Sequence, residues 1–533
     1  NKVNNLSKYG LILFAIIFSY YITGFTSLIL VLTNLSKFPV LIISISLFVS
    51  LIIFKGKIQL LKIKDTYMFL INEISQEFND CKKNKKDNIL FYIASVFMIL
   101  IFLSSIGPIN HPDATSYHVG YPYQYILRGG FFIDGGLHQA LLGIGDYTNL
   151  AFLQEKSNWF IRPLQILNLP ILILFLNKKV KNKYLVFLIL SCPVLILWST
   201  IGKPLFLSES SLVALFIIWM NQRTYENLKS LFIVFIFCIS IKISSLIIIF
   251  PLFVYVIYYL IIEKSFKYFL SKFIFDRLFL LTIFSFILLL YSRYIITDNF
   301  FYPLLDQIFN RDNSQINNFV SFLKSYGRNK FYPLNIFIPL SLDKISLSLG
   351  IPISTLTFLS LVKRKKNILT YLALIKISLL LIFGQGRGDY YFSPIFLLIY
   401  DSNSFVYDFR NRFLKDFLIT ITILQSFLFL TFTFMSISQN IRTLANYESN
   451  MKRYSYGYDA SQYMDRKDSF NTLFNGRNTR LYFGRNYVDR DLFEKCLMKN
   501  SENNFNSTTY CLTKHNIKRI ISFKDNLKLN KEE

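Results

Sequence analysis

Long apolar runs recur along most of this 533-residue chain, and no other feature constrains its fold as strongly. The runs are about 16 to 24 residues long, which suits helices that cross a hydrocarbon core of about 30 Å. Because that core offers no water to unpaired backbone groups, a crossing run must form a helix. A soluble chain of this length would instead divide into domains with polar surfaces. The sequence therefore predicts an α-helical polytopic membrane protein.

The positions of the runs give the expected spans. Several runs are short and 229–262 can be divided in more than one way, so we expect about 11 to 13 transmembrane helices. The first run has no small-residue cleavage site after it, and we expect it to be retained as a span. The candidate spans are 9–32, 39–54, 88–106, 160–176, 184–200, 205–220, 229–241, 244–262, 278–297, 346–362, 368–383, 390–400 and 417–437.

The basic residues between the runs predict which loops face the cytoplasm. Short loops rich in Lys and Arg stay inside, and all the basic clusters between spans fall on one side when the spans alternate. These clusters lie in 55–87, 178–183, 223–229, 263–277, 363–366 and 410–415. The N-terminus is then cytoplasmic, and the expected location is the plasma (inner) membrane. Three large pieces fall outside: the loops 107–159 and 298–345, and the tail 438–533.

The formal net charge of +26 does not indicate a nucleic-acid-binding protein. Much of the charge lies in short loops between spans, where the positive-inside rule places it. No compact basic domain with interleaved aromatic residues is present in the sequence. Membrane lipid is the partner that the composition indicates.

The sequence divides into a transmembrane domain, 1–437, and an outer C-terminal domain, 438–533. The tail is polar and has strand-like pieces at 480–483 and 519–523, so we expect a small α+β domain. Cys496 and Cys511 lie in it, and a disulfide between them is allowed if the tail is outside the cytoplasm.

The first outer loop contains the most suggestive cluster of polar residues. His111 and His118, two of the four histidines, flank Asp113 just after a predicted span. Asp113 can cap a helix that ends near Arg128, and this helix is amphipathic, as for a helix along a membrane surface. Asp113 is therefore either a simple helix cap or a functional acid that shares one side of the first turns with Tyr117.

Several motifs in this chain resemble the GT-C superfamily of membrane glycosyltransferases. The resemblance is to the protein mannosyltransferase and aminoarabinose transferase branch, and so to enzymes that are similar to glycosyltransferase family 39. His111-Pro112-Asp113 also matches three residues of a His-Pro-Asp-Glu pattern in another branch. Further similar motifs are Ile241-Lys242-Ile243-Ser244-Ser245-Leu246, Thr297-Asp298-Asn299-Phe300-Phe301-Tyr302-Pro303 and Gly386-Arg387-Gly388-Asp389-Tyr390-Tyr391-Phe392-Ser393-Pro394. The resemblance covers roughly 88–400.

This resemblance implies a dozen or so spans and an outer loop with catalytic acids. It also implies a polyprenyl-phosphate sugar as donor, a glycan, lipid or protein as acceptor, and inversion at the anomeric carbon. The chain departs from the pattern at Ala114, which replaces the second acid of the usual pair. Asp146 or Glu155 could supply that acid from farther along the loop. A divalent metal, Mg²⁺ or Mn²⁺, would bind at Asp113 if the reaction uses one.

The expected roles follow from the chemistry of transfer from a lipid phosphate. Asp113 would deprotonate or orient the acceptor hydroxyl, and the neighbouring His111, Tyr117 and His118 would contact the acceptor. Arg387, Lys203, Lys242 and Arg328 are the candidate cations for the departing phosphate. Lys242 lies within an apolar run and could instead extend towards the interface from a helix end.

Three other interpretations share these features. An envelope-glycan polymerase or ligase would have a similar number of spans and large outer loops. A lipid-linked sugar transporter or flippase would be expected to show internal repeats and paired charges within its spans. A non-catalytic relative of the transferases would explain Ala114.

Overall fold

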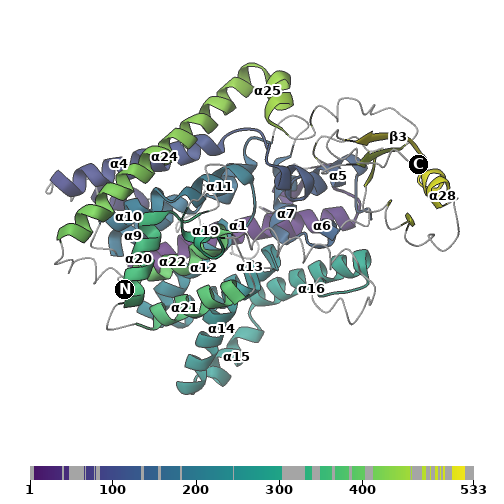
Figure 1. The fold of residues 1–533 in the computed structure, drawn as a ribbon. Coiled ribbons are helices and arrows are strands. Elements are labelled where there is room, and N and C mark those ends of the chain that lie inside the picture. Colours follow the sequence, from purple (N-terminus) through teal and green to yellow (C-terminus); the bar gives the residue numbers. More distant parts are fainter. Residues whose placement is uncertain are drawn as a thin grey trace.

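The computed structural model describes residues 5–38, 41–46, 65, 68–76, 79, 85–133, 137–153, 158–179, 183–243, 245–302, 331–338, 348–362, 367–382, 387–401, 412–455, 458, 471–475, 481, 487–489, 493, 496–497 and 507–522. These residues are mostly helical, with a small sheet near the C-terminal end (Figure 1).

The longer helices coincide with the predicted apolar runs. They are α1 (Asn5–Leu32), α4 (Lys85–Ser105), α9 (Leu169–Lys179), α10 (Lys183–Leu190), α11 (Pro193–Ile201), α12 (Phe206–Asn221), α13 (Tyr225–Ile241), α14 (Ser245–Ile262), α16 (Arg277–Thr297), α20 (Ile351–Val362), α21 (Ile368–Ile382), α22 (Phe392–Asp401) and α24 (Arg412–Ala445).

Shorter helices and three strands complete the described elements. The short helices are η1 (Ala114–His118), α5 (Gly120–Arg128), α6 (Leu137–Ala140), α7 (Ile144–Thr148), η2 (Asn149–Phe152), α8 (Ile161–Gln165), α15 (Phe266–Ile274), α19 (Leu334–Phe337), η4 (Gly388–Tyr391), α25 (Tyr447–Tyr454) and α28 (Ser507–Lys514). The strands are β1 (Asn471–Asn475), β2 (Tyr487–Asp489) and β3 (Ile517–Ser522).

Three helices in the described part of the chain are long and apolar enough to cross a membrane. They are Lys8–Leu32, Arg277–Thr297 and Asp416–Ala445. Ile249–Ile262 and Phe266–Ile274 make a fourth if this pair, bent by 116°, is one span. Other apolar helices among the described residues have 10–17 residues. These lengths and compositions indicate an α-helical membrane protein, while the expected number of about 11 to 13 spans stays a prediction.

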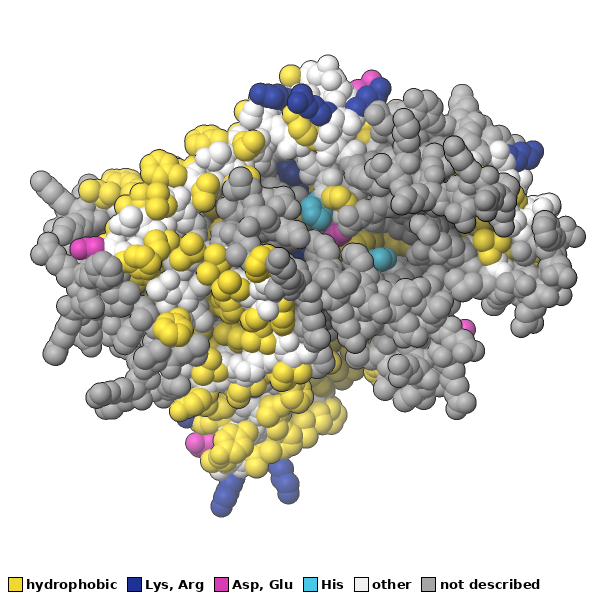
Figure 2. Space-filling model, viewed as in Figure 1, with side chains coloured by type: hydrophobic (Ala, Val, Ile, Leu, Met, Phe, Trp, Pro, Cys, Tyr) yellow, Lys and Arg dark blue, Asp and Glu magenta, His cyan; other side chains and the backbone are white. Residues whose placement is uncertain are grey.

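Exposed apolar stripes support the membrane assignment. On α16, the exposed side chains include Leu280, Phe284, Ile287 and Tyr291, which recur at helical spacing on one face. Helix α4 has the same pattern between Ile89 and Leu103. Figure 2 shows hydrophobic side chains over much of the lower part of the molecule, around α14 and α15. Apolar faces of this extent are stable against lipid rather than water.

Two predicted spans are interrupted in the structure. The run 160–176 is divided because α8 ends at Gln165 and α9 begins at Leu169, and the run 184–200 is divided between α10 and α11. In the second case Pro193 occupies the first helical position of α11. Proline lacks a backbone N–H and disfavours helix in the residue before it, which explains the break at Cys192.

Segments predicted to be cytoplasmic contact one another. Glu73 accepts a hydrogen bond from Tyr9 at 2.8 Å and pairs with Lys178 at 3.1 Å. Lys229 pairs with Asp276 at 2.5 Å, joining the start of α13 to the start of α16. The Glu73–Lys178 pair joins two predicted cytoplasmic segments, and the Lys229–Asp276 pair joins two more. Tyr9 is the first residue of the predicted span 9–32.

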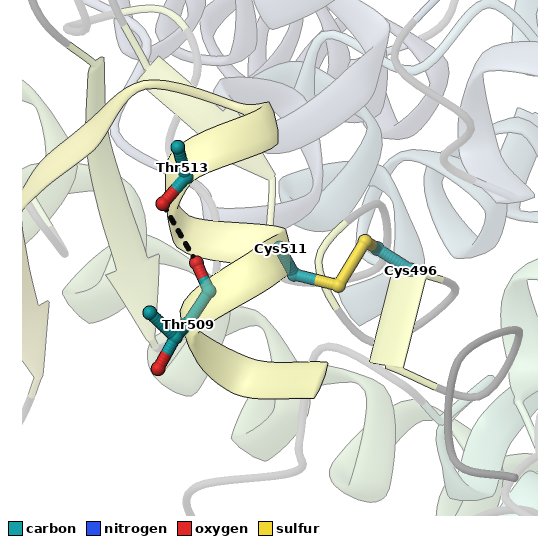
Figure 3. Close-up of a disulfide and its surroundings, with 4 residues drawn as sticks. All are labelled: Cys496, Thr509, Cys511 and Thr513. Atoms are coloured by element: carbon teal, nitrogen blue, oxygen red, sulfur yellow. Dashed lines mark hydrogen bonds between the residues drawn. A yellow bond between two sulfur atoms is a disulfide. The ribbon is translucent and has the colours of Figure 1, made fainter. Parts of the chain in front are cut away.

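The C-terminal region contains a parallel three-stranded sheet in the order β2-β1-β3. Strand β3 covers most of the predicted piece at 519–523. Cys496 and Cys511 are joined by a disulfide, and Cys511 lies on α28 next to β3 (Figure 3). Helix α24 continues to Ala445, past the predicted domain boundary at 438.

Leu481 connects the C-terminal region to the first outer loop. It is the described residue of the predicted strand 480–483, and that prediction is wrong at Leu481, which lies in a turn. Its backbone N–H donates to the Thr115 carbonyl at 3.0 Å. Its side chain packs into a cluster with Ala114, Val119 and Tyr123. Leu481 therefore joins the C-terminal region to the loop by one backbone hydrogen bond and by hydrophobic packing.

Helix α7 lies directly against α1. The Tyr20 hydroxyl donates to the Gly145 carbonyl at 2.9 Å, and the Thr148 hydroxyl donates to the Tyr20 carbonyl at 3.0 Å. Gly24 permits this approach, because a Cβ there would lie 2.2 Å from the Ile144 carbonyl oxygen. The first outer loop is thereby fixed to the transmembrane core.

We expect Gly24→Ala to lower stability by about 1–3 kcal/mol, because the added methyl overlaps backbone that cannot move cheaply. Gly10→Ala on the same helix is the matched control, since its Cβ would meet side chains at 3.5 Å, an ordinary contact. Thermal unfolding midpoints in detergent measure both. Equal midpoints would contradict the close approach of α1 and α7.

Candidate functional site

Asp113 occupies the N-cap position of η1, but its side chain does not cap the helix. Its backbone is already helical, with φ −65° and ψ −39°, and its side chain makes no capping hydrogen bond. The carboxylate instead faces Arg387, with 3.9 Å between Oδ2 and Nη1. The alternative of a simple cap is therefore wrong. The contact joins the first outer loop to the turn that leads into η4 and α22.

The helix after Asp113 differs from the prediction in two ways. It begins with a π-helical turn, η1, in which the Val119 N–H donates to the Ala114 carbonyl at 2.9 Å. Helix α5 follows and ends at Gly129, which has φ 83°, at the predicted place. Residues Gly120 to Tyr125 are buried, so α5 lies inside the protein rather than along a membrane surface. Side chains on both faces of α5 are apolar or aromatic, and both find protein partners.

His118 and Asp146 form a buried pair. His118 Nδ1 lies 2.6 Å from Asp146 Oδ1, and the two residues are 1% and 2% exposed. Asp146 Oδ2 accepts the Gly143 N–H at 2.9 Å, which fixes the carboxylate at the start of α7. His118 Nε2 is buried and has no hydrogen-bond partner among the described residues.

Burial shifts the pKa values of both partners towards their neutral forms. The pKa of His118 is held well below its usual value of 6.5, first by burial and then by Lys242 and Lys203. Burial raises the pKa of Asp146 to about 7, against the opposing effects of Lys242 and the Gly143 N–H. Near neutral pH the imidazole is therefore uncharged.

Lys203 and Lys242 reach this pair from the ends of two helices. Lys203 follows α11, is buried, and lies 4.5 Å from the ring centroid of Tyr390, whose hydroxyl accepts from its Nζ at 3.3 Å. Lys242 follows α13 and is half-buried. Lys242 therefore lies at a helix end, as one of the two alternatives expected. It also acts on the polar cluster, because its charge lowers the pKa of both His118 and Asp146.

The predicted acceptor-binding residues lie around Asp113. His111 Nδ1 accepts the Asp113 N–H at 3.2 Å. The Tyr117 ring lies 4.1 Å from that of His118 and stacks on His138 at 4.6 Å. Burial, followed by Asp113, raises the pKa of Tyr117 well above its usual value, so its phenol stays protonated.

Arg293 belongs to the site although the sequence analysis did not select it. It lies on α16, is 1% exposed, and its Nη2 donates to the Leu142 carbonyl at 3.4 Å. Its Nε and Nη1 are buried without partners among the described residues. An arginine within an apolar run is costly and is often functional, and this is the signal that could have identified it. His138 and Tyr390 were also missed.

The site thus holds more basic than acidic side chains. We call these residues the outer cluster; its acids are Asp113 and Asp146, and its cations are Arg387, Lys203, Lys242 and Arg293. With His118 neutral, the excess of cations favours a bound anion. Figure 2 shows histidine side chains beside an acidic one in the hollow at the middle of the face. Arg328 and Glu155 lie outside the described residues.

The outer cluster does not fit a divalent metal. Among the described residues, no group of three or more His, Cys, Asp or Glu side chains could hold a metal ion. The carboxylate of Asp113 faces a guanidinium, and that of Asp146 is engaged by His118 and Gly143. Magnesium and manganese prefer several oxygen ligands, and this arrangement offers one carboxylate beside a cation. We derive no step through a metal.

Comparison with known proteins adds no family to this description. No protein-family model matches the chain, and no curated protein has a significant match to it. The geometry of the outer cluster and the motifs of the sequence are therefore the basis for a functional proposal.

The paired shifts predict how Asp146→Asn changes acid stability. In the unfolded chain, His118 and Asp146 titrate near 6.5 and 3.8, whereas the folded pair holds a single proton across this interval. Between pH 3.8 and 6.5 the pair therefore holds one proton in the folded and in the unfolded state, and its contribution to the free energy of unfolding is constant. Below pH 3.8 the unfolded chain binds a second proton, and that contribution is lost.

In Asp146→Asn the unfolded chain still gains the His118 proton below pH 6.5, but the folded chain does not. The difference in unfolding midpoint between variant and wild type should therefore grow as the pH falls from 6.5 to 4. Thermal unfolding in detergent at a series of pH values measures it. A difference in unfolding midpoint that stays constant from pH 6.5 to 4 would contradict the statement that folded His118 remains unprotonated.

Proposed function

We propose that this protein is an integral membrane glycosyltransferase that transfers a sugar from a polyprenyl-phosphate donor to a lipid, glycan or protein acceptor. The observation that carries the proposal is the outer cluster. It sets a carboxylate, Asp113, beside Arg387 among buried cations at the ends of apolar helices. A carboxylate can orient or deprotonate an acceptor hydroxyl, and the cations can stabilise the negative charge of a lipid phosphate.

The proposed enzyme has the GT-C plan with about 11 to 13 spans in the plasma membrane. Its N-terminus is cytoplasmic, and its outer loops and small α+β C-terminal domain are extracytoplasmic. The contacts of Glu73 and Lys229, each within predicted cytoplasmic segments, support this arrangement. The Cys496–Cys511 disulfide also supports it, because disulfides persist in oxidising compartments outside the cytoplasm.

The proposed chemistry uses the charges of the cluster directly. Asp113 deprotonates or orients the acceptor hydroxyl, with His111, Tyr117 and His118 around the acceptor. Arg387 and Lys203 stabilise the negative charge that develops on the departing phosphate, and a guanidinium can bind two phosphate oxygens at once. Lys242 adds to the positive potential, so a phosphate in the cluster would lie among cations drawn from several helices.

We expect Asp113→Asn to abolish transfer, because a neutral amide can neither orient the acceptor hydroxyl as a carboxylate does nor balance the charge of Arg387. The measurement is mass spectrometry of envelope glycans and glycolipids from cells with wild-type protein, no protein, or the variant. One sugar mass should disappear in the last two strains.

The control is Glu448→Gln, an exposed carboxylate on α25. Collapse of a repeat ladder to single units would instead indicate a polymerase. Unchanged glycans in the strain without the protein would rule out the proposed transfer and favour a transporter or a non-catalytic relative.

We expect Arg387→Ala to weaken the use of donor by about 10-fold or more in apparent KM, because the proposed charge-assisted contact to phosphate is lost. Transfer by the purified protein in vesicles is followed as a function of the polyprenyl-phosphate sugar concentration. Arg453→Ala, an exposed arginine on α25, is the control. An unchanged donor dependence would remove Arg387 from the phosphate site.

A further inference from the structure

We infer that His118 and Asp146 form a proton-accepting dyad, in which His118 Nε2 takes the proton from the acceptor hydroxyl. The inference rests on the proposed transfer reaction and adds a catalytic residue to it. Asp146 is the positioning residue, since it acts through His118.

The geometry leaves one nitrogen of the His118 ring for this role. Nδ1 is held by Asp146 Oδ1 at 2.6 Å, and the second oxygen of that carboxylate is fixed by the Gly143 N–H. The Asn149 side chain also donates to the His118 carbonyl at 2.9 Å, which holds the backbone. Above the pKa of Asp146, which is about 7, the carboxylate is ionised and accepts Nδ1–H, so Nε2 carries the lone pair.

That nitrogen is buried without a partner among the described residues. A buried acceptor without a hydrogen bond destabilises the folded state, so such an atom in a folded protein calls for a specific explanation. A substrate hydroxyl that donates to Nε2 supplies one. A histidine that acts as a general base is commonly held in orientation by a third group, and the Asp146 carboxylate holds His118 in this way.

The surroundings of His118 place it within the outer cluster. The charged and titratable groups that act on it are Lys242, Lys203, Asp113, His138 and Asp146, and they come from the outer loop and from the ends of α11 and α13. The Tyr117 ring lies against its ring. Because Asp113 is among the groups that act on His118, an acceptor hydroxyl bound at Asp113 would lie in the same cluster as His118 Nε2.

In this arrangement Asp113 positions the acceptor hydroxyl and His118 accepts its proton. The Asp113 carboxylate lies 3.9 Å from the Arg387 guanidinium, and as a hydrogen-bond acceptor it is suited to holding a hydroxyl in place. His118 is uncharged near neutral pH because burial lowers its pKa, so its lone pair is available. Asp146 then stabilises the imidazolium that forms, at a distance of 2.6 Å.

The proposed transfer exchanges one bond at the anomeric carbon for another. A bond forms between the acceptor oxygen and the anomeric carbon, and the bond from that carbon to the phosphate oxygen breaks. The electron pair of the broken bond stays on the lipid phosphate, whose charge the cations of the outer cluster stabilise. The hydroxyl proton moves to His118 Nε2 and is later released to water.

The test compares His118→Gln with wild type in vesicles that contain a polyprenyl-phosphate hexose as donor. We expect transfer to fall by about 100-fold or more at saturating donor, the usual contribution of a general base. The apparent KM for donor should change little. His515→Gln, in the turn before β3, is the control.

Asp146→Asn provides a readout that a structural role would not change. Without the carboxylate the imidazolium is less stable, so the acid limb of the pH–rate profile should move to lower pH while the maximal rate falls. Full activity of His118→Gln, with Asp113→Asn inactive, would overturn the dyad and leave the proposed function standing. An unshifted acid limb in Asp146→Asn would also overturn it. No transfer by the wild-type protein would overturn both.

Discussion

A single buried carboxylate, that of Asp146, is the group on which the arrangement of the outer cluster depends. A carboxylate taken out of water must be hydrogen-bonded or paired, and Asp146 has the Gly143 N–H and His118 Nδ1. Lys242, Arg293 and Lys203 all favour its charged form. Because these residues follow or belong to three different helices, one buried charge ties the loop that contains Asp146 to the ends of those helices.

The outer loop is consequently part of the core rather than a cover over it. Helix α7 lies against α1 through Gly24, and α5 is buried on both faces. Leu481 adds a contact from the C-terminal region, through its N–H bond to the Thr115 carbonyl in η1. The residues on either side of Asp113 are thus fixed from within the membrane domain and from the tail. Such support on both sides is what a preorganised site requires.

The helices could largely be predicted because apolar runs of sufficient length have few alternatives in a membrane. Their breaks could not, since the interruption near Cys192 depends on a proline within an otherwise uniform run. In the site, clustering in the sequence singled out Asp113 and His118, and motif order singled out Arg387. The partner of Asp113 and the burial of Arg293 depend on contacts between distant segments, which spacing does not encode.

Three cations of the outer cluster lie at or near the C-terminal ends of helices, which partly compensate their charge. Lys203 follows the C-terminal end of α11, Lys242 caps that of α13, and Arg293 lies near the end of α16. The carbonyl end of a helix carries partial negative charge and stabilises a nearby cation by about 0.3–1 kcal/mol. This compensation is partial, so the cluster keeps an attraction for a full anionic charge. In the proposed reaction, a lipid phosphate would supply the negative charge that the helix ends provide only in part.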